Sequence, residues 1–181
     1  MEFTVKLRSK YVINAIRPFI IRNDKVLDIG CGNGLISRII EEQLHCNLVG
    51  TDIINYLEKD IKFKLMEAVN KLPFKDKEFD VGLLIDTLHH IPYYHQLGII
   101  KEAMRVCKVV LIFEIKPTWF AKTWDVLINP IHNKDMPIPV AMRDEYSWNN
   151  LLFTDKIKPE YYPIKTPFWY PETRYLFKLG E

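Results

Sequence analysis

Cysteine is scarce in this sequence: only Cys31, Cys46 and Cys107 occur among 181 residues. Three cysteines without metal-type spacing predict neither a disulfide framework nor a cysteine-ligated metal site, and they are typical of a reducing compartment. Long hydrophobic runs are also missing, and the acidic Glu2 lies near the N-terminus, so we expect no membrane span and no signal peptide. These absences together predict a cytoplasmic protein.

A charge excess of one sign is missing too. The 25 Lys and Arg residues nearly balance the 23 Asp and Glu residues, and the formal net charge is +2. With both signs interspersed, the sequence carries no broad electrostatic footprint for nucleic acid, although a local basic patch stays open. Repeats, linkers and low-complexity segments are absent, so residues 1–181 are expected to form a single domain that opens with a helical segment over residues 1–24.

The most informative stretch is a short apolar segment followed by three glycines. Val26–Ile29 has the composition of a buried strand and contains the acid Asp28 near its end. A helix is predicted directly after the glycines, because Leu35, Ile36, Ile39 and Ile40 share one helical face. A strand, a glycine turn and a helix form the arrangement in which a cofactor approaches bare backbone at a helix amino end.

The spacing of the glycines indicates which cofactor to expect. A dinucleotide fingerprint of the form G-x-G-x-x-G would need a small residue at Leu35, which disfavours an NAD-binding oxidoreductase. The pattern D-x-G-x-G-x-G that begins at Asp28 instead resembles motif I of the class I S-adenosylmethionine (SAM)-dependent methyltransferases. The resemblance implies SAM as cofactor, S-adenosylhomocysteine (SAH) as product, and cofactor-binding roles for Asp28, Gly30, Cys31, Gly32 and Gly34.

A second acid follows the next predicted strand. Leu48–Asp52 reads as that strand, and a carboxylate just past it can accept hydrogen bonds from both hydroxyls of a ribose. We therefore predict that Asp52 and the adjoining Ile53 bind the cofactor. The alternative is that Asp52 caps a short helix over residues 53–59.

A third block continues the resemblance. Residues 72–80 are similar to the "L-P-F-x-D-x-x-F-D" segment of small-molecule methyltransferases of the type 11 kind. The resemblance implies that Glu67 accepts a hydrogen bond from the adenine amino group and that Ala68 contributes its backbone. The sequence departs from the family pattern in having glutamate for aspartate and a spacer, residues 69–71, that is one residue longer.

The next apolar run, Val81–Ile85, predicts a central parallel strand, and it leads into a stretch that resembles the "L-H-H-I" ending of the family. Because ligands sit outside the carboxyl ends of such strands, we expect Asp86 to border the cofactor. His89 and His90 are the candidates for a catalytic proton-transfer or acceptor-orienting role. The alternative for both histidines is a structural, hydrogen-bonded role.

The second half of the chain predicts elements but no further motif. We expect a helix over residues 95–105, a strand over 106–114, a helix over 146–153 with Ser147 as a candidate cap, and β-rich segments over 161–166 and 173–179. Residues 117–146 occupy the place where the family carries its variable, substrate-shaping segment. Their aromatic cluster leaves open an acceptor pocket, a membrane-touching face or a satellite core.

The resemblance implies an α/β fold, a three-layer Rossmann-like sandwich whose seven-stranded, mostly parallel sheet has a C-terminal antiparallel strand. It implies methyl transfer from SAM to a small molecule by in-line displacement, with no metal. A tRNA or protein acceptor and a non-catalytic SAM-binding module stay open. Methylation of base amino groups and of cytosine C5 is disfavoured, because the sequence has neither an N/D-P-P-Y motif after the fourth strand nor a Pro-Cys pair.

Overall fold

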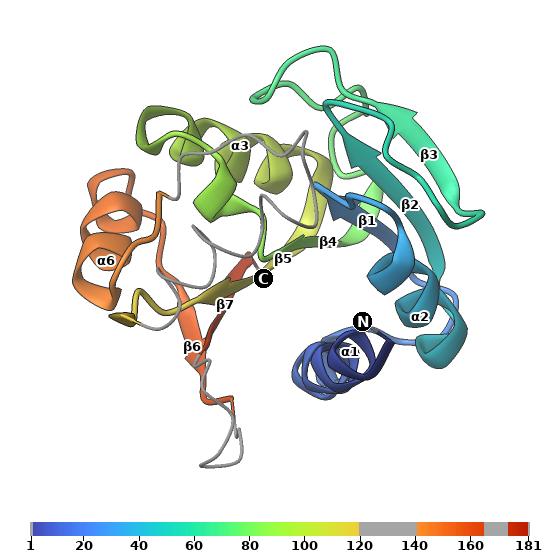
Figure 1. The fold of residues 1–181 in the computed structure, drawn as a ribbon. Helices are drawn as coiled ribbons and strands as arrows, with labels where there is room; N and C mark the ends of the chain where they lie inside the picture. Colours follow the sequence, from blue (N-terminus) through green and yellow to red (C-terminus); the bar gives the residue numbers. More distant parts are fainter. Residues whose placement is uncertain (1, 120–140, 165–173, 181) are drawn as a thin grey trace.

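The computed structural model describes residues 2–119, 141–164 and 174–180 (Figure 1). Its strands form one sheet in the order β3-β2-β1-β4-β5-β7-β6. The strands are β1 (Lys25–Ile29), β2 (Asn47–Asp52), β3 (Lys62–Leu65), β4 (Phe79–Ile85), β5 (Cys107–Ile115), β6 (Glu160–Tyr162) and β7 (Arg174–Gly180). The helices are α1 (Glu2–Ile16), α2 (Leu35–Leu44), α3 (Tyr93–Val106) and α6 (Glu145–Thr154), with 3₁₀ turns η1 (Arg17–Phe19) and η2 (Leu88–His90).

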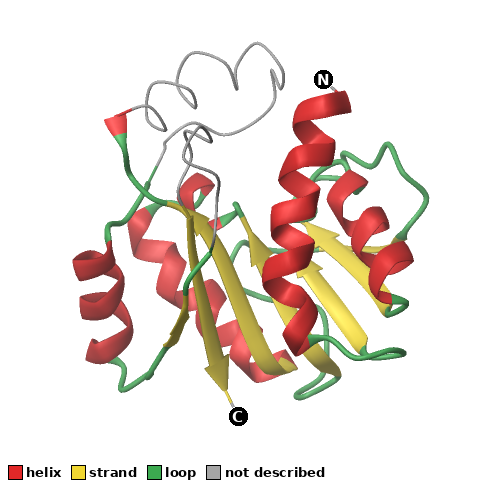
Figure 2. Ribbon diagram, turned by 90° about the horizontal axis from the view of Figure 1, so that it is seen from below, coloured by secondary structure: helices red, strands yellow, loops and turns green. Residues whose placement is uncertain are grey.

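The sheet is mostly parallel. Strands β1 to β5 pair in parallel, whereas β7 pairs antiparallel with β5 and also with β6. Helices α1 and α2 cover one face of the sheet and α3 and α6 cover the other (Figures 1 and 2). The predicted three-layer Rossmann-like sandwich with a C-terminal antiparallel strand is thus confirmed.

Each face of the sheet carries its own apolar core. On β4, Val81, Leu83 and Ile85 belong to the core under α1 and α2, whereas Leu84 belongs to the core under α3 and α6. The alternation follows from strand geometry, in which successive side chains point to opposite faces. Trp148 of α6 is fully buried in the second core. Burial on both faces explains why the central strands read as continuous apolar runs.

Several local expectations are refined by the structure. Helix α3 runs directly into β5 at Cys107, so no glycine turn separates the two. The cap of α6 is Asp144, whose side chain accepts a hydrogen bond from the backbone N–H of Ser147; the prediction of Ser147 as the cap was wrong. Pro18 lies at the start of η1, where its missing N–H costs no hydrogen bond. The predicted insert over residues 117–146 lies largely outside the described residues.

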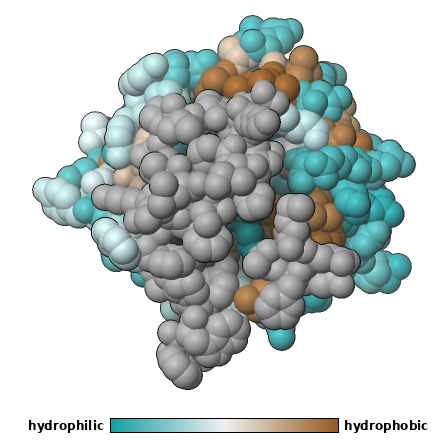
Figure 3. Space-filling model, viewed as in Figure 1, coloured by the Kyte–Doolittle hydropathy of each residue, from teal (hydrophilic) through white to brown (hydrophobic). Residues whose placement is uncertain are grey.

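Figure 3 shows the face seen in Figure 1: hydrophilic residues cover most of the outer rim, and hydrophobic residues form separate patches. Large exposed side chains include Tyr94, Trp119 and Phe153, with exposed fractions of 79%, 81% and 78%. Among the described helices, none combines the length and the apolar character that crossing a bilayer requires.

Candidate functional site

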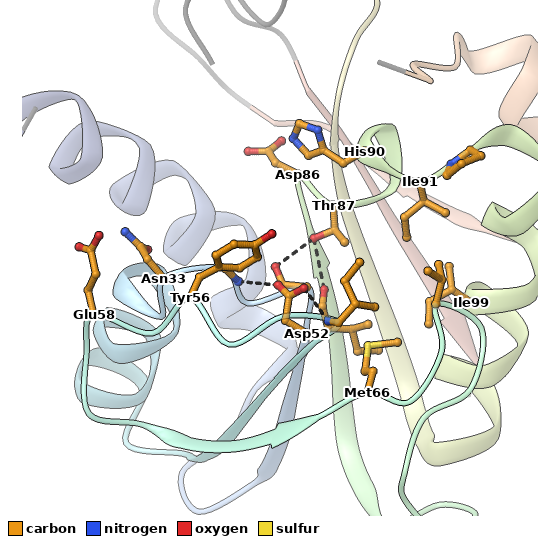
Figure 4. Close-up of a pocket in the computed structure, with 16 residues that line it drawn as sticks. Asn33, Asp52, Tyr56, Glu58, Met66, Asp86, Thr87, His90, Ile91 and Ile99 are labelled. Carbon is orange, nitrogen blue, oxygen red and sulfur yellow. Dashed lines mark hydrogen bonds between the residues drawn. The ribbon is translucent and has the colours of Figure 1, made fainter. Parts of the chain in front are cut away.

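A pocket of about 350 Å³ lies where the loops after β1, β2 and β4 meet (Figure 4). Strand β1 lies between β2 and β4, so the chain order reverses at this point of the sheet. Ligands of doubly wound sheets bind at such switch points, outside the carboxyl ends of the strands. Apolar side chains line much of the pocket, among them Ile29, Ile53, Met66, Ile91 and Ile99. This size and lining suit a small organic ligand.

The glycine turn shapes one wall of the pocket. Gly30, Gly32 and Gly34 all have positive φ, at 76°, 54° and 75°. A Cβ at Gly30 would come within 2.3 Å of the Thr87 side chain, so Gly30 allows β1 and β4 to approach each other. A Cβ at Gly32 would meet no described atom within 4 Å, because this glycine faces the open pocket. Gly34 instead precedes α2 and packs near Leu57, away from the lining.

Asp52, the last residue of β2, lines the pocket beside this turn. Its Oδ2 accepts a hydrogen bond from the backbone N–H of Gly32 at 2.9 Å, and its Oδ1 accepts one from Ile53 N–H at 2.7 Å. Burial raises the pKa of Asp52, and the hydrogen bonds from Gly32 and Ile53 oppose that shift. The carboxylate keeps lone pairs for the donors of a ligand diol. No helix follows within residues 53–61, so the alternative of a helix cap is excluded.

The predicted ligand contact of Asp28 is not supported by its position. Asp28 is buried behind the glycine turn, where it accepts a hydrogen bond from Ser37 Oγ of α2 at 2.6 Å. Burial raises its pKa to about 6. Cys31 also lies outside the lining, because its Sγ packs against Gly50 of β2. Both residues fix the turn from behind rather than face the pocket.

Glu67 and Ala68 were predicted to hold adenine, yet both are exposed and lie outside the lining. Alternation along the chain that leaves β3 turns Met66 inward, where it is buried and lines the pocket, and Glu67 outward. Ala68 forms a turn with Lys71, whose N–H donates to the Ala68 carbonyl at 3.1 Å. That turn accommodates the extra residue of the spacer. The apolar Met66 and Val69 therefore take the place predicted for the acid.

Asp86, directly after β4, borders the pocket and is the centre of an ion-pair cluster in which Asp86 and Arg174 are buried and Arg8 is partly exposed. Its Oδ2 lies 2.9 Å from Nη2 of Arg8 in α1 and 3.1 Å from Nη2 of Arg174 in β7. Burial raises the pKa of Asp86, but the guanidinium groups of Arg174 and Arg8 outweigh burial and lower it overall. The backbone of Asp86 is left-handed, with φ 49°, a conformation that aspartate tolerates better than most residues. The structure thus keeps a charged carboxylate at this edge of the pocket.

The two adjacent histidines have different surroundings. His89 is only 5% exposed, and its Nδ1 lies 2.7 Å from Glu114 Oε2, while Glu114 Oε1 accepts hydrogen bonds from the N–H groups of Thr87 and Leu88. His89 lies outside the pocket lining, and its contact with Glu114 fits the structural, hydrogen-bonded alternative; a catalytic role of His89 stays a prediction. His90 lines the pocket, with its ring 4.1 Å from that of His89. Burial, assisted by the charge of His89, lowers the pKa of His90 to about 3, so its ring stays neutral near pH 7.

Sequence reasoning missed the partners of these groups. Glu114 had a readable signal, because it is the one acid in strand β5, which apart from Lys108 is otherwise apolar. Arg8 and Arg174 had no such signal in the sequence. They come from α1 and β7, and only the folded chain brings them to Asp86. Thr87 was also missed as a lining residue; its hydroxyl donates towards the carbonyl oxygens of β1 and the glycine turn (Figure 4).

The residues present fit SAM. Gly32 leaves room for a ligand against bare backbone, Asp52 offers a carboxylate for the ribose diol, and Met66 with Ile99 offers an apolar surface for adenine. Asp86 contributes a further oxygen, Oδ1, that is buried and has no hydrogen-bond partner among the described residues. These features do not suit a metal ion, because His89 and Asp86 are already engaged in salt bridges.

Comparison with known proteins supports this assignment. Residues 27–110 match the family model of the methyltransferase domain. The tRNA U34 carboxymethyltransferase of Nautilia profundicola is 34% identical over 97 residues, which are 47% of this chain and 32% of that protein. The sterol 24-C-methyltransferase erg6 of Schizosaccharomyces pombe is 30% identical over 113 residues, 56% of this chain and 29% of that protein. The chain spans about a third of the length of these two relatives.

Solved structures agree with the fold. A SAM-dependent methyltransferase of Methanosarcina mazei has a TM-score of 0.62 at 21% identity, and the match covers 91% of this chain and 93% of that one. At this identity the likeness shows the fold alone, and the family match adds the glycine motif and the following strands. Together they support the resemblance: residues 27–110 match the methyltransferase domain family, the fold is the one that SAM-dependent methyltransferases have, and both imply SAM as the cofactor.

Proposed function

We propose that this protein transfers the methyl group of SAM to a small-molecule acceptor by in-line displacement. The observation that carries the proposal is the fixed placement of the Asp52 carboxylate against the Gly32 turn, in a pocket at the switch point of a methyltransferase-family domain. When bound, SAM supplies a methyl group already activated by its positively charged sulfur. The protein therefore needs mainly to hold the cofactor and the acceptor in line.

Positioning is the largest contribution that such a pocket makes. Correct orientation of two reactants can supply about 7–11 kcal/mol of barrier reduction in favourable cases. Here Asp52 and the glycine turn are held by backbone hydrogen bonds, and His90 is held against His89, which Glu114 orients. With a pKa near 3, the neutral ring of His90 orients an acceptor through a hydrogen bond and is too weak a base to remove a proton from an alcohol or amine.

A small acceptor is favoured by two features. The pocket has a volume of only about 350 Å³, and the net charge of +2 gives the chain no broad positive face for a polynucleotide. A tRNA acceptor is the second candidate, favoured by the likeness to a tRNA U34 carboxymethyltransferase.

Cofactor binding is tested first by thermal unfolding with SAM, SAH and NAD in separate samples. A ligand at about a hundred times its dissociation constant adds roughly 2.7 kcal/mol, which raises the midpoint of a domain of this size by about 5–10 °C. We expect SAM and SAH to raise the midpoint and NAD to leave it unchanged. A rise with NAD alone would contradict the proposal.

The acceptor is tested with SAM that carries a labelled methyl group, offered with a small-molecule extract and, separately, with total tRNA. Label in the small-molecule fraction is the expected result. Label in tRNA would replace the proposed acceptor class by the second candidate. Label in neither fraction, with SAM binding intact, would favour a SAM-binding module without catalysis.

A further inference from the structure

The loop that carries His90 to the pocket is held through both its N–H groups and its carbonyl groups. Glu114 of β5 accepts hydrogen bonds from the backbone N–H groups of Thr87 and Leu88. Near the start of α3, the side-chain Nε2 of Gln96 lies within hydrogen-bond distance of three backbone carbonyl oxygens. They belong to Leu88, Ile91 and Ala141, at 2.9, 3.1 and 2.9 Å. An amide nitrogen has only two N–H groups, so two of these carbonyls share one of them.

Gln96 also binds a piece of the chain between β5 and α6. Its Oε1 accepts a hydrogen bond from Nε of Arg143 at 2.5 Å. Two residues earlier in the chain, the backbone N–H of Ala141 donates to the carbonyl of His89 at 2.6 Å. This piece lies within residues 117–146, the segment that shapes the acceptor site in the family that the sequence resembles. One side chain thus joins that segment to the loop that lines the pocket.

The chemistry of these contacts fixes the orientation of the Gln96 amide. The three contacts of Nε2 are with acceptors and the contact of Oε1 is with a donor, so a rotated amide would place like groups against each other. Gln96 is fully buried, among inward positions of α3 that are otherwise apolar: Ile99, Ile100, Ala103 and Val106. A buried amide is costly without partners, whereas a fully partnered one fixes a single arrangement of the groups that it joins.

We propose that Gln96 is a positioning residue for methyl transfer, which holds His90 at the pocket and joins its loop to residues 141–143. Gln96 does not itself line the pocket, so it acts through the loop. Figure 4 shows His90 and Asp52 apart, with Thr87 between them. The orientation of the acceptor therefore depends on Gln96, and the binding of the cofactor does not. The inference rests on the proposed function, since it assigns the acceptor to the His90 side of the pocket.

The test replaces Gln96 by methionine, an unbranched apolar side chain that lacks the amide donors. Gln43→Met is the matched control, because it is the same substitution at an exposed position of α2. Arg143→Met is a second variant at a partly exposed position, and it removes only the partner of Gln96 Oε1. Three quantities are measured for each protein: the dissociation constant of SAH by titration calorimetry, the imidazole signals of His90 by NMR, and the transfer of labelled methyl from SAM to the small-molecule extract.

We expect Gln96→Met to bind SAH as the wild type does and to transfer label up to about 100-fold more slowly at saturating SAM, the loss that a misplacement of about 1 Å can cause. Arg143→Met should show the same pattern with a smaller loss, because the amide donors remain. Gln43→Met should change none of the three quantities. Unchanged SAH affinity also reports that a variant is folded, and if Gln96→Met does not fold, Arg143→Met carries the test.

The NMR signals of His90 separate positioning from a merely structural effect. In Gln96→Met they should move and begin to titrate between pH 5 and 8, because the ring is no longer held in its buried place. The charged groups that face His90 are those of His89, Asp86 and Arg8, and none of them is altered in the variant. A change at His90 therefore reports the loop and not a lost charge.

Two results would overturn the assignment. One is a folded Gln96→Met protein whose His90 signals match those of the wild type; the other is an SAH affinity that falls as much as the transfer rate, which would indicate a general disturbance of the pocket. Failure of the proposed function looks different, because the wild type itself would then transfer no label to the extract. The His90 signals of the variants would in that case decide by themselves whether Gln96 holds the loop.

Discussion

The sharpest test of the cofactor site is the removal of the Asp52 carboxylate. Asp52→Ala takes away the acceptor that faces the pocket and also the hydrogen bonds from Gly32 N–H and Ile53 N–H. The second loss concerns partly exposed loop backbone, which water can solvate, so the folded state should survive. Asp52→Asn keeps the size of the side chain and one acceptor oxygen, and it should have an intermediate effect.

The magnitude follows from the two hydrogen bonds that a carboxylate makes to a ribose diol. Each hydrogen bond to a charged group contributes about 1.5–3 kcal/mol, so Asp52→Ala should lose about 3–6 kcal/mol of binding free energy. At 1.4 kcal/mol for each tenfold, this corresponds to SAH binding that is about 10²- to 10⁴-fold weaker. Asp52 is already partly desolvated and held by backbone N–H groups. Little of the binding free energy is therefore spent on ordering the Asp52 side chain when the ligand binds.

Titration calorimetry with SAH measures the loss, and thermal unfolding without ligand shows whether the variant is folded. Asp60→Ala is the control: it removes the same charge from an exposed position in the same loop region, so it separates direct contact from a general electrostatic effect. Unchanged SAH affinity in a folded Asp52→Ala protein would refute the assignment of Asp52 to the ribose.

Three further predictions concern the same site. Alanine at Gly30 or Gly32 adds about 1–2 kcal/mol of strain, because the backbone of both is left-handed. Gly30→Ala should lower the melting temperature more, because its Cβ would also meet the Thr87 side chain at 2.3 Å. Gly32→Ala should remain folded and lose SAH binding, because its Cβ would project into the pocket. In the folded state the pKa of Asp28 is about 6, against 3.8 for the free side chain. Between about pH 4 and 6 the folded state therefore retains a proton that the unfolded state releases. The free energy of unfolding should fall by about 3 kcal/mol as the pH rises through this range. Urea unfolding of Asp28→Asn between pH 4 and 8 isolates this effect; a difference from wild type that does not change with pH would contradict it. The imidazole of His90 should show no titration by NMR between pH 8 and 5, since its pKa is lowered to about 3, and a midpoint near 6.5 would contradict the burial that lowers it.

Local pattern was sufficient for the framework of the site. The strand, the glycine turn and α2 lie where the apolar periodicity and the glycines predicted them, and Asp52 follows β2 at the edge of the pocket. These features are set within a few residues of chain, by side-chain alternation in strands and by the positive φ that glycine tolerates. The resemblance that rests on this motif implied the family, the cofactor and a mostly parallel, seven-stranded sheet.

Orientation within the site was less predictable. A shift of one residue exchanges inward and outward side chains, so Met66 lines the pocket where Glu67 was expected. Asp28 and His89 belong to motifs that resemble ligand-binding blocks, yet each is turned into the core towards a partner, Ser37 and Glu114 respectively. The sequence indicates that such residues lie near a site and does not indicate which way they face.

By itself the sequence determined the glycine turn and the acid that follows β2, because each depends on the local pattern of the chain, and the resemblance to a known family implied the fold. The tertiary structure alone decided that Asp86 lies between Arg8 and Arg174, and that Glu114 holds the loop that carries the two histidines. Arg174 is 88 residues from Asp86 in the sequence. Pairings of this kind depend on how α1, β4, β5 and β7 pack around one end of the sheet, and no local periodicity records that packing.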